Sequence, residues 1–148
     1  MKKFSSSSLA RTVLKTLVEK SVFKNSVSPN YDGYCLSNIP ATILSSLNVA
    51  GLNKPPLSNI DVLSSLKQAK KKVLLLIDSL SYIQLSNHLK RNKHSIFHGL
   101  IEKGVFFPIT STFPSTTTTA LTSLATGLTP QEHGIVGYTM YLKELGLV

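Results

Sequence analysis

A run of five consecutive apolar residues, Val73 to Ile77, constrains the fold of this chain more than any other feature. The run lies in the stretch KKKVLLLIDSLSY, with lysines before it and an aspartate after it. Periodicity alone does not separate a strand from a helix in so short a run. The charged ends and the pattern that follows favour a central parallel strand buried on both faces. The sequence therefore predicts a core built around residues 73–77.

The segments after this run alternate between helical and strand-like patterns. Residues 81–103 predict helix, in two pieces, and residues 105–113 (VFFPITSTF) predict a second strand. Residues 118–126 predict another helix, with Gly127 as its left-handed C-terminal residue. Strand, helix, strand, helix is typical of an α/β fold with helices on both faces of a mostly parallel sheet.

Helices are also expected before the run. Residues 8–22 carry apolar side chains at helical spacing among basic ones, and they are expected to pack on their own domain. A second helix is expected after Asn38, which is a candidate N-cap, with Pro40 in its first turn. A third is expected in IDVLSSLKQAKKK, where lysines suit the C-terminal end.

The net charge of +9 is concentrated in the first half of the chain, because residues 1–72 hold 11 of the 16 lysines and arginines. A solvated basic surface is the favoured interpretation. Binding of nucleic acid or a membrane surface by residues 2–24 and 67–72 is the alternative. The single cysteine, Cys35, allows no disulfide within the chain. No signal peptide or membrane span is recognised, so the expected location is cytoplasmic.

Asp78 directly follows the apolar run. Ligands of open α/β sheets bind at the carboxyl ends of the strands, so a carboxylate there is well placed to hold a metal ion. Asp78 could equally cap the next helix, as could Ser79 or Ser81. Position alone favours neither role.

The stretch FPSTTTTALTSLATG places hydroxyl groups at the start of the helix expected over residues 118–126. Unpaired N–H groups and the helix dipole favour a phosphate there, and a Thr or Ser hydroxyl activated by a metal could attack it. From the residues alone, a role in capping the helix is favoured. His88, His94 and His98 are expected at the surface, and His133 is expected to stabilise a turn.

Two segments together resemble the alkaline-phosphatase superfamily, and within it the type I phosphodiesterase / nucleotide pyrophosphatase family. They are VLLLIDSLSY and ITSTFPSTTTTALTSLATGLTPQEHGIVGY. The upstream piece PNYDGYCLSNIPATILSSLNV is similar to bacterial members. The resemblance implies the N-terminal part of a three-layer α/β/α sandwich over residues 28–148, preceded by a basic amphipathic extension, residues 1–27.

The resemblance also implies a reaction. Members hydrolyse phosphoric ester or pyrophosphate bonds with two divalent cations, commonly zinc, and a Thr or Ser nucleophile that forms a covalent phospho-enzyme. By this similarity Thr117 is the nucleophile and also a metal ligand, and Asp78 is the first metal-binding aspartate. Thr116 and Thr118 are the matching candidates for substrate binding. The expected substrate is a phosphorylated small molecule rather than a specific nucleic acid.

The chain departs from the family pattern at three points. Ala120 stands where eukaryotic-type members have an asparagine that helps to bind phosphate, and Ser79 stands where glycine is usual. Most family metal ligands come from sequence that would follow Val148. We therefore expect a truncated reading frame with an incomplete site, weak zinc binding and little hydrolysis. The alternative is a catalytically inactive member that binds or self-associates through exposed sheet edges.

Overall fold

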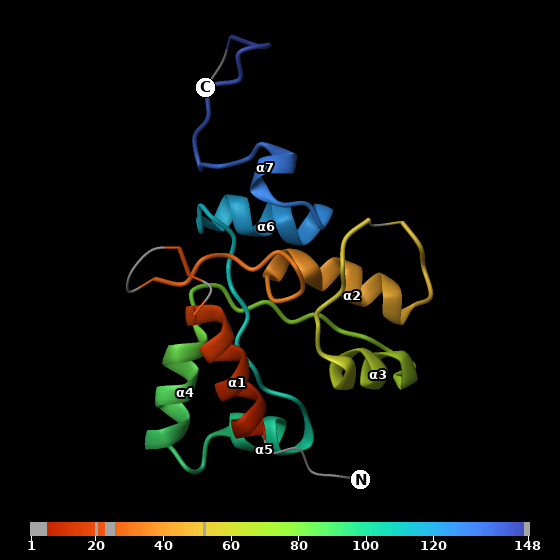
Figure 1. Ribbon diagram of the computed structural model, residues 1–148, viewed down its shortest axis with the longest axis vertical. Helices are drawn as coiled ribbons and strands as arrows, with labels where there is room; N and C mark the ends of the chain where they lie inside the picture. Colours follow the sequence, from red (N-terminus) through yellow and green to blue (C-terminus); the bar gives the residue numbers. More distant parts are fainter. Residues whose placement is uncertain (1–5, 20, 23–25, 52, 147–148) are drawn as a thin grey trace.

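The computed structural model describes residues 6–19, 21–22, 26–51 and 53–146, and its regular elements are helices (Figure 1). In chain order they are α1 (Ser6–Glu19), the 3₁₀ helix η1 (Leu36–Asn38), α2 (Ile39–Ser46), α3 (Ile60–Gln68), α4 (Tyr82–Arg91), α5 (Ile96–Lys103), α6 (Thr117–Thr126) and α7 (Pro130–His133). Helix α6 packs on η1, α2 and α7, and α2 also packs on α3.

The predicted α/β fold, as the N-terminal part of a three-layer sandwich with a parallel sheet, is wrong for this structure. The described part of the chain contains no β-strand and no sheet. Residues 73–77 and 105–109 are non-helical, as expected of strands, but they form no ladder. A short apolar run can favour extended backbone, whereas a strand also needs a neighbouring strand to share its hydrogen bonds. An isolated parallel bridge joins Cys35 to Thr110.

The apolar run is also not buried. Its five side chains, Val73 to Ile77, are between 47% and 91% exposed. The prediction of a core around this run is therefore wrong, because a strand is buried on both faces only in a sheet whose two faces are covered by other elements.

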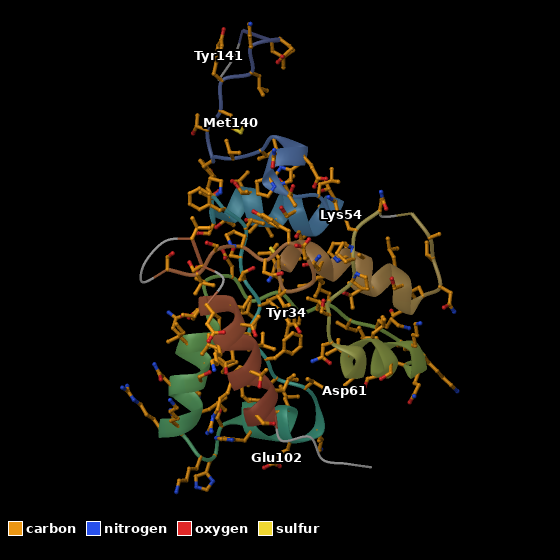
Figure 2. All side chains as sticks on the ribbon, viewed as in Figure 1. Tyr34, Lys54, Asp61, Glu102, Met140 and Tyr141 are labelled. Carbon is orange, nitrogen blue, oxygen red and sulfur yellow. The ribbon has the colours of Figure 1, made fainter. Side chains whose placement is uncertain are left out.

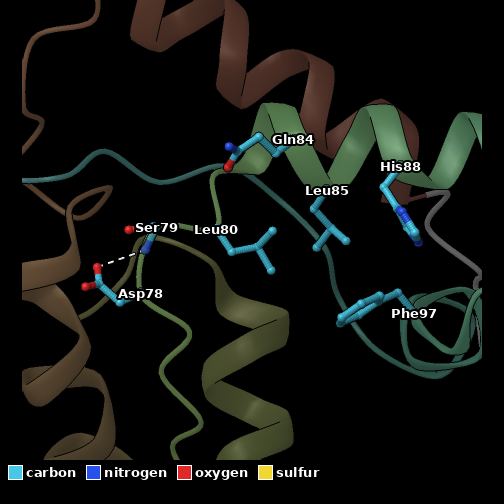
Figure 3. Close-up of a pocket in the computed structure, with 7 residues that line it drawn as sticks. All are labelled: Asp78, Ser79, Leu80, Gln84, Leu85, His88 and Phe97. Atoms are coloured by element: carbon cyan, nitrogen blue, oxygen red, sulfur yellow. Dashed lines mark hydrogen bonds between the residues drawn. The ribbon is translucent and has the colours of Figure 1, made fainter.

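The predicted helices are confirmed. In α1, Ala10, Val13 and Leu17 are buried, so the amphipathic segment packs on its own chain, beside α4 (Figures 1 and 3). The helical stretch after residue 81 does divide into two, α4 and α5. Among the described residues, no helix is long and apolar enough to cross a membrane.

Local capping explains where several helices begin and end. Asn59 accepts hydrogen bonds from Asp61 N and Val62 N at the start of α3. Ser81 and Gln84 form a reciprocal capping box at the start of α4. At the end of α6, Gly127 has a φ of 71°, the left-handed conformation that glycine adopts without a steric cost.

The best-connected buried side chain is Asn38, which is 1% exposed. Its Oδ1 accepts from Gly33 N (3.2 Å) and Cys35 N (2.9 Å), and its Nδ2 donates to Tyr31 O (2.7 Å) and Pro55 O (3.0 Å). The amide thereby uses its full hydrogen-bonding capacity. Asn38 does occupy the predicted N-cap position of α2, but its side chain makes no capping bond. It instead joins the 31–35 turn to the segment before α3.

Two threonines extend this polar core. Thr42 Oγ1 donates to Asn38 O (2.7 Å) and accepts from Leu57 N (2.8 Å). Thr110 Oγ1 donates to Tyr34 O and accepts from Asn30 N, both at 3.0 Å. Tyr34 lies near the middle of the molecule (Figure 2), so these bonds connect the segment before α6 to the turn that Asn38 holds.

Helix α7 is tied to the loop before α3 by Glu132. Its carboxylate accepts from Thr129 N (2.8 Å) and Thr129 Oγ1 (2.7 Å), and it pairs with Lys54, which is labelled in Figure 2. The Lys54 ammonium and the two Thr129 donors lower the pKa of Glu132 from 4.5 to about 2. The carboxylate is therefore held in its charged form by groups from two segments.

Replacing Asn38 by alanine is expected to destabilise the protein by about 2–4 kcal/mol, because two buried N–H groups and two carbonyls lose their partner. Urea unfolding followed by circular dichroism measures this. Asn87→Ala, at an exposed position of α4, is the matched control and should change stability by less than about 0.5 kcal/mol. Equal effects of the two substitutions would contradict the role of Asn38.

The pKa of Glu132 predicts an acid-sensitive contribution to stability. Because the folded pKa lies below the unfolded one, the stabilisation is complete above pH 4.5 and is lost as the pH falls through about 2. Glu132→Gln should therefore be less stable than wild type at pH 7, and the difference should shrink below pH 4.5 and vanish below about pH 2. Thermal unfolding across this range tests it, with the exposed Glu102→Gln as control. A difference that does not vary with pH would contradict the prediction.

Candidate active site

Asp78 and Thr117, 39 residues apart in the chain, lie side by side. Thr117 Oγ1 donates to Asp78 Oδ2 at 3.4 Å, and both residues are exposed. This distance is long for an O–H···O hydrogen bond, so the two groups are neighbours with room between them rather than a tight pair. The structure thus brings together two side chains that the family resemblance singles out, although the expected sheet is missing.

A tight turn after the apolar run positions Asp78. Its Oδ1 accepts from Ser79 N at 2.9 Å, and Ser79 has a φ of 62°. That left-handed conformation costs a residue with a Cβ about 1–2 kcal/mol, which explains why glycine would suit position 79. Helix α4 is capped by Ser81 and not by Asp78, so the alternative role of Asp78 as a helix cap is excluded.

The threonines on either side of Thr117 have different surroundings. Thr116 is the N-cap of α6: its Oγ1 accepts from Thr119 N and shares a 2.8 Å hydrogen bond with Thr119 Oγ1. Thr118 lies in the first turn, and its carbonyl accepts from Thr122 Oγ1. In the described part of the chain no hydrogen bond uses the N–H groups of Thr117 and Thr118. These N–H groups are the free donors of the helix N-terminus.

A cavity of about 690 Å³ opens beside this pair. Asp78, Ser79, Ser115 and Thr117 supply part of its polar lining, and Ala120 also lines it. None of the described lysines, arginines or histidines does so. The apolar wall includes Leu76, Ile77, Leu80, Leu85, Phe106, Phe107, Ile109, Leu121 and Leu124. Tyr82 stacks on Phe106 at 4.9 Å between ring centroids, which holds the start of α4 against the 105–109 segment.

A second, smaller cavity of about 470 Å³ begins at the same carboxylate (Figure 3). Asp78 and Ser79 lie at one end, His88 and Phe97 at the other, and Leu80 and Leu85 stand between them. His88 Nδ1 lies 3.2 Å from the Asn92 amide and Nε2 lies 3.1 Å from Ser95 Oγ. The imidazole therefore hydrogen-bonds to the segment that connects α4 and α5, and it does not face Asp78.

The structure gives His133 the turn-stabilising role that the sequence predicts. Its Nδ1 accepts from Ile135 N at 3.0 Å, and its Nε2 lies 3.0 Å from Ser123 Oγ, a buried group of α6. Because a backbone N–H can only donate, the proton of the neutral ring is assigned to Nε2. His133 thus joins α6 to the turn after α7.

The residues present do not complete a metal centre. A zinc site needs at least three protein ligands. Asp78 and Thr117 supply two oxygens, and no group of three or more His, Cys, Asp or Glu that could hold a metal exists among the residues described. The two-cation centre that the resemblance implies therefore does not fit these residues by themselves.

The sequence singled out Asp78 by its position after the apolar run, and it placed the hydroxyls of residues 115–117 at a helix start. The family resemblance then selected Thr117 among them. The sequence also predicted unpaired N–H groups at this helix start, whereas it did not reveal the left-handed turn at Ser79. The glycine usual at position 79 in the family is the signal that indicates such a turn.

Comparison with known proteins adds to this geometry. The family model for type I phosphodiesterase / nucleotide pyrophosphatase matches residues 72–148, just over half of the chain, and these residues include both Asp78 and Thr117. Searches of curated proteins and of solved structures each returned no match. On the family match, the chain belongs to the type I phosphodiesterase / nucleotide pyrophosphatase family.

Proposed function

We propose that Asp78 and Thr117 form part of the active site of a phosphoric ester hydrolase, with Thr117 as the nucleophile and Asp78 as a metal ligand. The observation that carries this proposal is the 3.4 Å approach of Thr117 Oγ1 to Asp78 Oδ2 within the family-matched region. A threonine hydroxyl needs a base or a metal beside it to become nucleophilic at neutral pH. A carboxylate at this distance can itself orient the hydroxyl and can also bind a cation.

The start of α6 supplies the complementary group for a phosphate. The N–H groups of Thr117 and Thr118 are free, and the N-terminal end of a ten-residue helix favours negative charge. A phosphoryl group held there lies next to the Thr117 hydroxyl. In the proposed step Oγ1 bonds to phosphorus while the ester P–O bond breaks. Asp78 Oδ2 accepts the hydroxyl proton, and the leaving alcohol takes its proton from water. The hydroxyl of Thr116, which is engaged in capping, would support the helix, and its contact with substrate stays a prediction.

The family's divalent cations, which we take to be zinc, would supply charge neutralisation and nucleophile activation when bound. Asp78 and Thr117 would hold one cation only in part, since they provide two of the three or more ligands required. We therefore propose weak metal affinity for the part of the chain described.

The cavity indicates the substrate class. Its lining is largely apolar around one carboxylate and several hydroxyls. The cavity therefore suits a phosphorylated small molecule in which the organic group joined to the phosphate is uncharged. With Ala120 at the position of the family's asparagine, phosphate binding would depend on the helix N-terminus.

A second candidate is a catalytically inactive family member that acts at most by binding. The specific observation in its favour is the lack of a three-ligand cluster among the described residues. The experiments below separate the two candidates.

Replacing Thr117 by alanine is expected to reduce hydrolysis of a p-nitrophenyl phosphodiester in excess Zn²⁺ by at least about 100-fold, because the nucleophile is removed. Release of p-nitrophenolate measures the rate. Thr117→Ser keeps a hydroxyl and should retain activity. The matched control is Thr126→Ala, an exposed threonine at the other end of the same helix, which should retain activity. An undiminished rate in Thr117→Ala would refute the assignment, and no release from wild type would favour the inactive candidate.

Zinc is expected to bind weakly, with a Kd above about 10 μM, because the described ligands are incomplete. Asp78→Asn should weaken binding by about 10-fold or more, whereas Asp61→Asn, an exposed aspartate of α3 labelled in Figure 2, should leave it unchanged. Equilibrium dialysis measures both. Two tightly held zinc ions per chain, or equal effects of the two substitutions, would contradict this expectation.

A further inference from the structure

Ser79 lies beside the Asp78–Thr117 pair and lines two cavities. It lines the cavity of about 690 Å³ together with Asp78 and Thr117, and it also lines the cavity of about 470 Å³ that begins at the same carboxylate (Figure 3). Its N–H donates to Asp78 Oδ1 at 2.9 Å, so the turn that positions the carboxylate also fixes the position of the serine. Ser79 is exposed and can therefore contact a molecule in the cavity.

Some of the serine and threonine hydroxyls in the larger cavity already have hydrogen bonds within the chain. These are the hydroxyls of Ser81, Thr110 and Thr117. No hydrogen bond in the described part of the chain uses the hydroxyls of Ser79, Ser111 and Ser115, which also line the cavity. Ser79 is the one of these three that adjoins Asp78, so its hydroxyl is a free donor next to the carboxylate.

The backbone of Ser79 takes a conformation that serine adopts only at a cost. Its φ of 62° lies in the left-handed region, where glycine, the residue usual at this position in the family, avoids the clash of a Cβ. The other described non-glycine residue with a positive φ is Asn48, a residue type that tolerates this region better. Residues that keep a strained backbone gather at sites of binding and catalysis. What serine supplies here that glycine would not is one hydroxyl group in the cavity.

A phosphoryl group in the cavity needs hydrogen-bond donors for its non-bridging oxygens. None of the described lysines, arginines or histidines lines the cavity, so hydroxyls and backbone N–H groups are the donors on hand. The N–H groups of Thr117 and Thr118 are free at the start of α6. The 3.4 Å contact between Thr117 Oγ1 and Asp78 Oδ2 brings the turn at Ser79 next to this helix start.

We propose that Ser79 positions the substrate: its hydroxyl donates a hydrogen bond to a non-bridging phosphoryl oxygen while the start of α6 holds the same group. The inference rests on the proposed function, since it names a substrate contact of the same site. A hydrogen bond to a charged oxygen is stronger than one between neutral groups, so the contact strengthens binding of the phosphoryl group. Ser79 forms no covalent bond in the step and keeps its proton.

Binding of phenylphosphonate, a non-hydrolysable ligand with an apolar ring, tests the contact without turnover. Calorimetry on the full chain without added metal measures its Kd. Ser79→Ala and Ser79→Gly should each weaken binding by about 10-fold, because both remove the hydroxyl. Ser79→Gly should also raise the melting temperature by about 2 °C, because glycine relieves the left-handed strain. Weaker binding together with higher stability is not expected of a residue that only supports the fold.

Two further variants control for the backbone. Ser79→Asn retains a hydrogen-bond donor and suits a left-handed backbone, so it should keep the Kd within about 3-fold of wild type. Asn48→Gly places glycine at the other positive-φ position, which does not line the cavity, and should leave the Kd unchanged. In the p-nitrophenyl phosphodiester assay, Ser79→Ala should raise KM by about 10-fold and change kcat by less than about 3-fold.

The binding and turnover measurements fail separately. Phenylphosphonate binding that depends on Ser79, without any hydrolysis by wild type, would leave this contact standing and end the hydrolase assignment alone. The contact would be overturned by a wild type that binds no phenylphosphonate up to about 10 mM. It would also be overturned by Ser79→Ala binding as tightly as wild type, or by an equal loss of affinity in Asn48→Gly.

Discussion

The four hydrogen bonds of the buried Asn38 amide are the interaction on which the rest of the structure depends. They connect the 31–35 turn, the start of α2 and the segment that leads to α3. Thr110 joins the same turn to the segment before α6, through its side chain and through backbone bonds with Tyr34 and Leu36. Helix α6 then packs on η1 and α2, where Thr119 and Ser123 are fully buried. The position of the α6 N-terminus is thus set by polar contacts, since the largest fully buried side chains are mainly polar ones.

Two local structural features, a turn and a helix N-cap, form the candidate site on this framework. One is the turn in which Ser79 takes a left-handed conformation and Asp78 accepts the Ser79 N–H. The other is the N-cap of α6, where Thr116 satisfies the Thr119 N–H and leaves the donors of Thr117 and Thr118 free. Because this turn lies next to the α6 N-cap, a carboxylate, a hydroxyl and a helix N-terminus lie together at the mouth of an apolar cavity. This arrangement agrees with family membership. The described residues, however, supply too few ligands for a metal centre.

The helices could be predicted from the sequence because their signals are local. Gly127 after α6 and the apolar spacing of α1 are both visible within a few residues. The sheet could not be predicted reliably, because pairing depends on a partner that a run such as Val73–Ile77 does not reveal. Asn38 shows the same difference: its position before α2 was predictable, whereas the four bonds of its side chain reach residues up to 17 positions away. The proximity of Asp78 and Thr117 followed from family resemblance, since nothing local connects residues 39 positions apart.

The central claim is that the side chains at positions 78 and 117 are neighbours, and a cross-linking measurement tests it most directly. The double variant Asp78→Cys/Thr117→Cys would be treated with a short bifunctional thiol reagent, and the joined peptides identified by mass spectrometry. The native Cys35 is fully buried and should not compete. The account predicts efficient linkage between positions 78 and 117, and none in the Asp61→Cys/Thr117→Cys control. A folded 78/117 variant that links no better than the control would contradict it.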